Sequence, residues 1–140
     1  MKKKLLLILL ALTGLALVWG EDRDHQSNMA MNRPDVKVFQ WGENRAGDCH
    51  QLGATLEIRP DGIASFHSEI WSRTHGTDVW HSVIHLLGPG GELGNSGNHD
   101  SPGIPHDRDG PEHKVRLDYN FNFPPENFGR ITVAVEHSGC

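Results

Sequence analysis

Alternation of apolar and polar side chains predicts that this chain is built from β-strands. The pattern is clearest over residues 113–123, where every second residue is apolar: Val115, Leu117, Tyr119, Phe121 and Phe123. Other segments alternate, or carry short apolar runs bounded by turn residues, at 35–41, 54–59, 64–71, 78–87 and 130–136. No segment has a sustained helical period. About six strands separated by turns predict an all-β fold, either an antiparallel β-sandwich or a small barrel.

Residues 54–71 are predicted to form a β-hairpin. Apolar residues alternate on both sides of the sequence Pro60-Asp61-Gly62. Proline fixes φ at the first turn position, aspartate can bond to nearby backbone, and glycine accepts the left-handed conformation that ends a three-residue loop. Both strands can then place their apolar residues on one face of a sheet.

The first 20 residues have the layout of a secretory signal peptide. Three lysines precede an apolar run from Leu5 to Trp19, and a cut is expected before Glu21. A permanent membrane anchor is the alternative, but the run is shorter than the roughly 20 apolar residues of a bilayer span. We therefore expect an exported protein, periplasmic or secreted, without a membrane span after cleavage. Residues 21–34 would be a flexible lead-in, and residues 35–140 a single β domain.

Charge argues against nucleic acid as the partner. The full sequence has 13 Lys and Arg against 18 Asp and Glu, a formal net charge of −5. Removing residues 1–20 takes away three lysines and brings the net charge to −8. An acidic chain without a cluster of basic residues favours neither nucleic acid nor an anionic membrane surface.

Two cysteines, Cys49 and Cys140, predict one disulfide bond in an exported protein. The bond would fasten the last residue to the start of the hairpin and close a loop of about 90 residues, which constrains the unfolded chain. Two free thiols are the alternative. A catalytic thiol is not indicated, because His50 is the only basic neighbour of Cys49.

A set of short motifs resembles a family of small exported bacterial domains of unknown function. The motifs are Phe39-Gln40-Trp41, Gly47-Asp48-Cys49, Gly53-Ala54-Thr55-Leu56, the turn segment 60–66 and Asp78-Val79-Trp80. The resemblance runs from about Phe39 to Cys140 and includes the closing cysteine. These are turn, strand and disulfide positions, so the resemblance implies a fold and assigns neither an activity nor functional residues.

The segment from Gly88 to His113 is predicted to be a long loop with a short extended piece near Glu92, because Gly, Pro, Asn, Asp and His dominate it. Its candidate ligands for zinc or calcium are His99, Asp100, His106, Asp107, Asp109 and His113. Known motifs fit poorly, because Pro105 interrupts a calcium-loop pattern and neither HExxH nor CxxC occurs. A solvated polar loop is the alternative to a metal site.

Catalytic motifs are missing from the sequence, which contains no GxSxG element. Trp71 at a strand end, with Asn120 and Asn122 on the polar face of a later strand, could form a ligand-binding platform; core packing is the alternative for Trp71. We therefore expect an exported, non-catalytic binding or interaction domain for an envelope or extracellular ligand. The alternative is a metal-binding domain, or a metal-dependent hydrolase, that uses the loop of residues 88–113.

Overall fold

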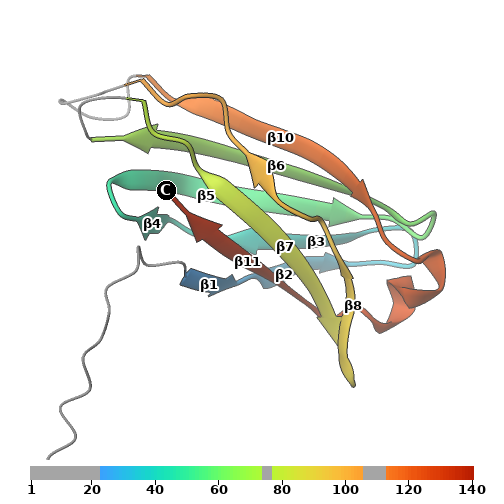
Figure 1. Ribbon diagram of the computed structural model, residues 1–140. Coiled ribbons are helices and arrows are strands. Elements are labelled where there is room, and N and C mark those ends of the chain that lie inside the picture. Colours follow the sequence, from blue (N-terminus) through green and yellow to red (C-terminus); the bar gives the residue numbers. More distant parts are fainter. Residues whose placement is uncertain (1–22, 74–76, 106–112) are drawn as a thin grey trace, which may run out of the picture.

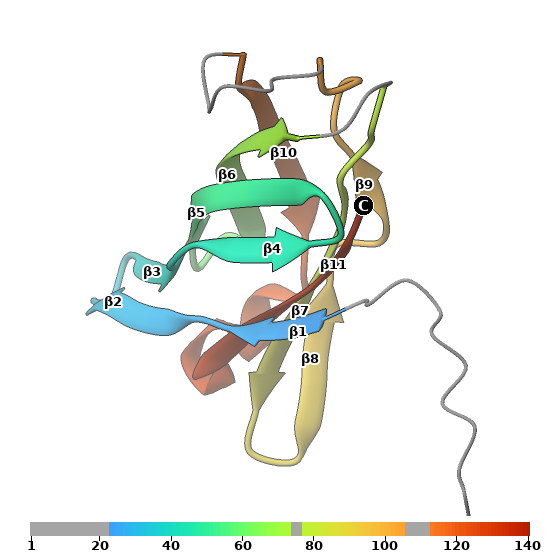
Figure 2. The ribbon, with the colours of Figure 1, turned by 90° about the vertical axis from the view of Figure 1, so that its left-hand side faces the viewer.

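Two antiparallel β-sheets face each other in the structure (Figures 1 and 2). This computed structural model describes residues 23–73, 77–105 and 113–140. The prediction of an all-β fold is confirmed, and the sheets form a sandwich-like arrangement. Apolar side chains of both sheets meet in a core whose largest fully buried residues are Trp80, Phe39 and Phe66.

The smaller sheet has five strands in the order β1–β11–β7–β8, and β9 also pairs with β7. Its strands are β1 (Arg23–Gln26), β7 (His81–Gly88), β8 (Gly91–Asn95), β9 (His99–Asp100) and β11 (Val133–Gly139).

The larger sheet has six strands in the order β10–β6–β5–β3–β2, and β4 also pairs with β5. Its strands are β2 (Asn28–Asn32), β3 (Lys37–Trp41), β4 (Asn44–Ala46), β5 (Cys49–Ile58), β6 (Ile63–Ser72) and β10 (Val115–Asn122). A 3-10 helix, η1 (Pro125–Arg130), lies between β10 and β11 and packs Phe128 against the core. Within the described ranges, no helix is long and apolar enough to cross a membrane.

Strands β1 and β2 occupy residues that the sequence predicts to be a flexible lead-in. β1 pairs with β11 in the smaller sheet and β2 with β3 in the larger one. The backbone N–H of Ser27, between the two strands, donates to the Ala134 carbonyl (3.0 Å). The alternation of apolar and polar residues does not reveal this segment, because edge strands need few buried residues. In β2 only Met29 and Met31 are half-buried. The predicted signal peptide over residues 1–20 lies outside the described residues.

Part of the loop predicted between Gly88 and His113 also forms strands. Both β8 and β9 pair with β7 in the antiparallel sense. Glycine-rich edge strands carry little periodic signal, so the sequence indicates only the extended piece near Glu92. Residues 106–112 lie outside the described residues.

β5 and β6 form the predicted hairpin, and its turn uses the predicted chemistry. Gly62 has a φ of +84°, in the left-handed region, and its N–H donates to the Arg59 carbonyl (3.0 Å). The backbone N–H of Ile63 donates to the Asp61 carboxylate (3.2 Å). A Cβ atom at Gly62 would lie 2.6 Å from the Phe123 carbonyl oxygen, so glycine is required by space as well as by conformation.

A β-bulge at Leu52 and Gly53 exchanges the inward-facing and outward-facing positions of β5. On the turn side of the bulge, even-numbered residues from Ala54 onward are buried, whereas on the other side Gln51 and Cys49 are buried. The pairing register with β6 shifts by one residue at the same place. An extra residue has this effect because side chains alternate between the two faces of a strand.

Three contacts connect β4 and the first half of β5 to β11 and to Cys140, the residue that follows it, and we call them the β5–β11 seam. The disulfide between Cys49 and Cys140, with Cα atoms 6.0 Å apart, confirms the predicted pairing. Gln51 Nε2 donates to Glu136 Oε1 (3.0 Å), and the side-chain amide of Asn44 donates to a serine hydroxyl of β11 (3.1 Å). In Figures 1 and 2 the C-terminus accordingly lies beside β4 and β5.

Glu136 is a carboxyl group buried between the two sheets, with 0% of its surface exposed. Its Oε1 accepts hydrogen bonds from Gln51 Nε2 (3.0 Å), Ser82 Oγ (2.9 Å) and Trp80 Nε1 (3.4 Å). No described residue bonds to Oε2. Burial raises the pKa of Glu136 above its usual value, and the three hydrogen bonds only partly oppose this effect.

Removal of the disulfide should destabilise the fold. The double variant Cys49→Ser with Cys140→Ser is expected to lose about 2–4 kcal/mol of unfolding free energy, because the bond restrains a long segment of the unfolded chain. Equilibrium denaturation of the oxidised wild type and the variant measures the difference. A loss below about 0.5 kcal/mol would show that the bond does not constrain this chain as expected.

Glu136 should make the stability fall as pH rises. An acid whose pKa is higher in the folded state holds its proton there while the unfolded chain has lost it. The unfolding free energy then falls by up to about 1.4 kcal/mol per pH unit, from the usual carboxyl pKa up to the folded one. Glu136→Gln should remove this slope in urea denaturation between pH 5 and 8, whereas the exposed Glu57→Gln should keep it. Equal slopes in wild type and Glu136→Gln would show that Glu136 does not cause the pH dependence of stability.

Candidate functional site

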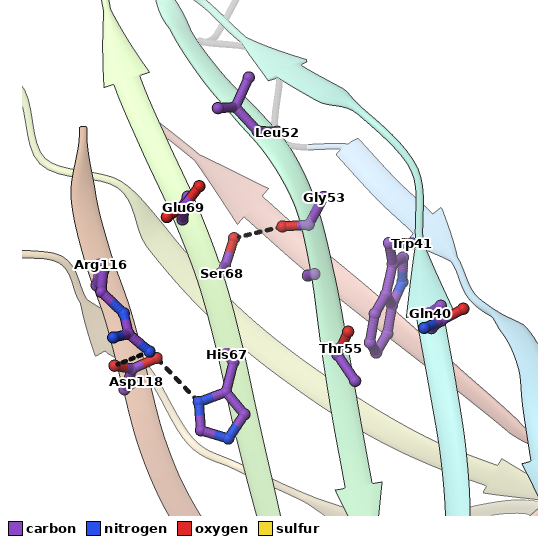
Figure 3. Close-up of a pocket in the computed structure, with 11 residues that line it drawn as sticks. Gln40, Trp41, Leu52, Gly53, Thr55, His67, Ser68, Glu69, Arg116 and Asp118 are labelled. Atoms are coloured by element: carbon purple, nitrogen blue, oxygen red, sulfur yellow. Dashed lines mark hydrogen bonds and ion pairs between the residues drawn. The ribbon is translucent and has the colours of Figure 1, made fainter. Parts of the chain in front are cut away.

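The outward face of the larger sheet carries two neighbouring hollows. The first hollow, of about 470 Å³, lies over β3, β5, β6 and β10 (Figure 3). The second hollow, of about 620 Å³, lies over β4, β5 and the end of β6. Leu52 of the bulge lines both hollows, so they meet where β5 reverses its facing.

Gly53 holds the bulge between the two hollows. Its φ of +141° is a conformation that residues with a side chain rarely adopt. Ser68 Oγ, on the neighbouring strand, donates to the Gly53 carbonyl (3.0 Å; Figure 3). A Cβ atom at this position would lie 3.4 Å from the Trp41 carbonyl oxygen. The bulge therefore depends on a glycine.

Charged side chains of β6 and β10 pair with each other along the first hollow. His67 Nδ1 lies 2.9 Å from Asp118 Oδ1, and Arg116 lies 3.3 Å from the other oxygen of that carboxylate (Figure 3). Beside them, Lys114 Nζ lies 3.1 Å from a Glu69 carboxylate oxygen. Exposed pairs of this kind contribute little to stability. Their effect is to hold donors and acceptors at defined positions on an open surface.

The residues Asp118, His67 and Thr55 form a row across three neighbouring strands. Carboxylate, imidazole and hydroxyl have the same order in a catalytic triad, in which the imidazole takes a proton from a hydroxyl nucleophile. However, the His67 ring forms a hydrogen bond with Asp118 alone among the described residues, and none joins it to the Thr55 hydroxyl. The His67 and Asp118 side chains are also 55% and 39% exposed, so water is not excluded from them. The arrangement supports binding better than catalysis.

Arg45, His50 and Trp71 form a row across β4, β5 and β6 in the second hollow. They lie opposite one another in the strand pairing and therefore share the outward face. The His50 ring stacks on Trp71 with centroids 4.3 Å apart, and the Arg73 guanidinium lies 5.3 Å from the Trp71 ring centre. Trp71 is only 6% exposed, yet it lies outside the core cluster. It is covered by surface neighbours and not by the core.

His50 lies in a setting that favours its neutral form. Burial of the ring lowers the pKa of His50, and the positive charges of Arg73 and Arg45 lower it further. The carboxylates of Glu43 and Asp48 act in the opposite direction but with smaller effect. The second hollow thus combines two guanidinium groups with a neutral imidazole.

The structure separates the three residues predicted to form a ligand platform. Trp71 follows Ile70, the residue that pairs with the start of β10. Asn120 and Asn122 are exposed near the other end of β10, five and seven residues beyond that start. At about 3.3 Å per residue, this places them roughly 20 and 26 Å from Trp71 along the sheet. Trp71 lines the second hollow, and the two asparagines line neither hollow.

The predicted metal ligands that the structure describes do not come together. Asp100 lies 2.7 Å from His81 Nδ1, whereas the His99 ring stacks on Tyr119 with centroids 3.8 Å apart. His99 Nε2 lies 3.0 Å from the Ser96 carbonyl oxygen. His113 is exposed and belongs to no group of potential ligands among the described residues, and His106, Asp107 and Asp109 lie outside them. The metal site in this loop stays a prediction.

One group of potential metal ligands occurs among the described residues: Cys49, Asp78 and Cys140. The two sulfur atoms are bonded to each other, so neither is a thiolate ligand in this structure. The group therefore reflects the disulfide and its acidic neighbour.

Sequence reasoning identified Trp71 but missed His50, Arg45, Arg73 and Leu52 as parts of a site. In a strand without a bulge, Trp71 would lie opposite Gln51. The register shift places His50 there and turns Gln51 inward. Gly53 was the available signal, because an isolated glycine in a strand pattern often marks a bulge.

Comparison with known proteins yields one match. Residues 55–140 match the profile of a family described as a family of unknown function, DUF6294. No curated protein and no solved structure matches the chain. Over the matched residues, the resemblance to a domain of unknown function is confirmed.

The pKa of His50 should respond to Arg73. Because burial and the Arg73 charge both lower this pKa, the ring should titrate below the usual value for histidine, and Arg73→Gln should raise its midpoint. The equivalent change in the first hollow, Arg116→Gln, should leave the midpoint unchanged. An NMR titration of the His50 ring protons measures all three proteins. A midpoint that is the same in Arg73→Gln as in wild type would contradict this electrostatic description.

Proposed function

The chain belongs to the DUF6294 family, which has no known function, and from its surface we propose an exported, non-catalytic domain that binds an extended polar ligand. The ligand would lie on the outward face of the larger sheet, across Leu52. The observation that carries the proposal is that two hollows meet at this bulge on a solvent-facing sheet surface. Bulges commonly re-aim side chains beside functional sites.

The chemistry of the first hollow supports a polar ligand. Its lining includes the donors and acceptors of Gln40, Thr55, His67, Glu69 and Asp118. An apolar peptide would leave these groups without partners, which is costly for groups that binding buries. A polyhydroxylated chain offers both donors and acceptors at short intervals. A carbohydrate of the cell envelope or the surroundings is therefore the ligand class that fits best.

Export is supported by two observations. The disulfide between Cys49 and Cys140 is of a kind that persists in oxidising compartments. The first 20 residues also have the charge and apolar pattern of a signal peptide. Periplasmic or secreted location fits a domain that meets envelope or extracellular saccharides.

Binding should be lost when a charge is placed on Leu52. We expect electrophoresis through gels that contain a soluble polysaccharide to retard the wild type, in a panel of pectate, alginate, xylan and mannan. Leu52→Glu should lower the affinity for the retarding polysaccharide at least about tenfold, because it places a negative charge at the point where both hollows meet.

Leu87→Glu is the matched control for this experiment. Leu87 is also half-buried, also lies in an inner strand, and also adjoins a register shift, but it belongs to the other sheet. It should leave the retardation unchanged. Absence of retardation by every polysaccharide, or equal loss in both variants, would overturn the proposed function.

A further inference from the structure

The arginines of the second hollow have no acidic partners among the described residues. In the first hollow, Arg116 pairs with a carboxylate, but neither Arg45 nor Arg73 lies within ion-pair distance of a described one. Arg45 Nε donates to the Gly47 carbonyl (3.0 Å), which leaves the rest of its guanidinium available. Glu43 also lines this hollow and forms no ion pair with a described residue. Two guanidinium groups without a salt bridge to a described residue thus line one depression in a chain whose formal net charge is −5.

Trp71, which lines the second hollow, carries a buried hydrogen-bond donor that is not used. Trp71 Nε1 is buried and has no hydrogen-bond partner among the described residues. The other described tryptophans differ: Trp41 Nε1 donates to the His25 carbonyl (2.7 Å), and Trp80 Nε1 lies 3.4 Å from Glu136. A buried donor without a partner is costly, so an acceptor from a ligand would remove a penalty of the free protein.

We propose that the second hollow binds the carboxylate of an acidic sugar unit, with Arg45 and Arg73 on the carboxylate and His50 and Trp71 at the floor. Planar guanidinium groups match carboxylates in geometry and form hydrogen bonds stronger than those between neutral groups. The volume of about 620 Å³ accommodates one or two sugar rings. This inference rests on the proposed function and specifies the ligand: a saccharide that continues into the first hollow and carries carboxylates.

The acidic net charge of the chain favours a sugar carboxylate over a dense polyanion. Acidic groups border both hollows, with Glu43 in the second and Glu69 and Asp118 in the first. They would repel a ligand of much higher charge density, such as double-stranded nucleic acid, which carries one charge per roughly 1.7 Å. A uronic acid carries one carboxylate on each sugar ring and offers hydroxyl groups between them.

An NMR titration of ¹⁵N-labelled protein tests the proposal directly. Trigalacturonate should shift the indole N–H signal of Trp71 and the Nε–H signals of Arg45 and Arg73. The indole signal of Trp80, which lies in the core, lines neither hollow and already has a partner, should stay in place. The methyl ester of the same trisaccharide should bind at least about tenfold more weakly, which corresponds to the loss of about 1.4 kcal/mol from a charge-assisted contact.

Variants separate the carboxylate contact from general binding. Arg73→Gln should weaken the binding of trigalacturonate at least about tenfold and leave the affinity for the methyl ester nearly unchanged. Arg59→Gln, which removes an exposed arginine that lines neither hollow, should keep the wild-type preference for the acid over the ester. Arg73 and Arg59 are both exposed, so neither change should prevent folding.

Three outcomes would overturn the inference. One is equal affinity for trigalacturonate and its methyl ester; if Leu52→Glu still abolished both, the proposed function would stand without the carboxylate contact. Another is no binding of trigalacturonate, while a neutral polysaccharide still retards the protein. The third is tighter binding of tetra-aspartate than of trigalacturonate at the same residues, which would indicate an acidic peptide.

Discussion

One extra residue in β5 determines how one end of the sandwich is built. Side chains alternate between the faces of a strand, so the bulge at Leu52 and Gly53 exchanges inward and outward positions for the rest of β5. Cys49 and Gln51 then face the core, where Cys140 and Glu136 of the opposite sheet meet them. Without the bulge, both residues would face solvent and the β5–β11 seam could not form.

The same reversal produces the outward surface of this end. When Gln51 turns inward, His50 turns outward and comes to lie against Trp71. The disulfide and the second hollow are therefore neighbouring consequences of one backbone feature, on opposite faces of the same strand. Fixing Cys49 to the other sheet also fixes the strand that carries His50, which favours a preorganised binding surface. The proposed ligand would meet a rigid sheet and not a loop.

The sequence predicts the buried parts of this fold well and its edges poorly. The hairpin and the strand ending near Phe123 were predictable because a buried face imposes a period of two. β2 was missed and β8 was indicated only as a short extended piece, because edge strands are covered on few sides and tolerate polar residues and glycine. Of the predicted ligand residues, Trp71 lines a hollow, but its relation to Asn120 depends on strand order, which alternation does not encode.

The candidate site could not be derived from the sequence because it depends on a register shift. Counting back from the turn at Gly62 would pair Trp71 with Gln51, which places an amide beside the indole. The register shift places the His50 imidazole opposite Trp71 in place of that amide. Arg45 of β4 pairs with His50 and therefore lies in the same row of outward-facing side chains. Gly53 alone signals the shift, and glycine occurs in strands at tight bends and close backbone contacts as well as at bulges.

Deleting Gly53 and measuring the redox equilibrium of Cys49 with Cys140 in glutathione buffers tests the role of the bulge most directly. The account predicts that both thiols stay reduced in a buffer that oxidises the wild type, because Cys49 would face away from β11. Deletion of Ala30, at the register shift between β2 and β3, is the control and should leave the disulfide intact. If the Gly53 deletion kept its β-sheet spectrum and formed the disulfide as readily as the wild type, the bulge would not determine the facing of β5.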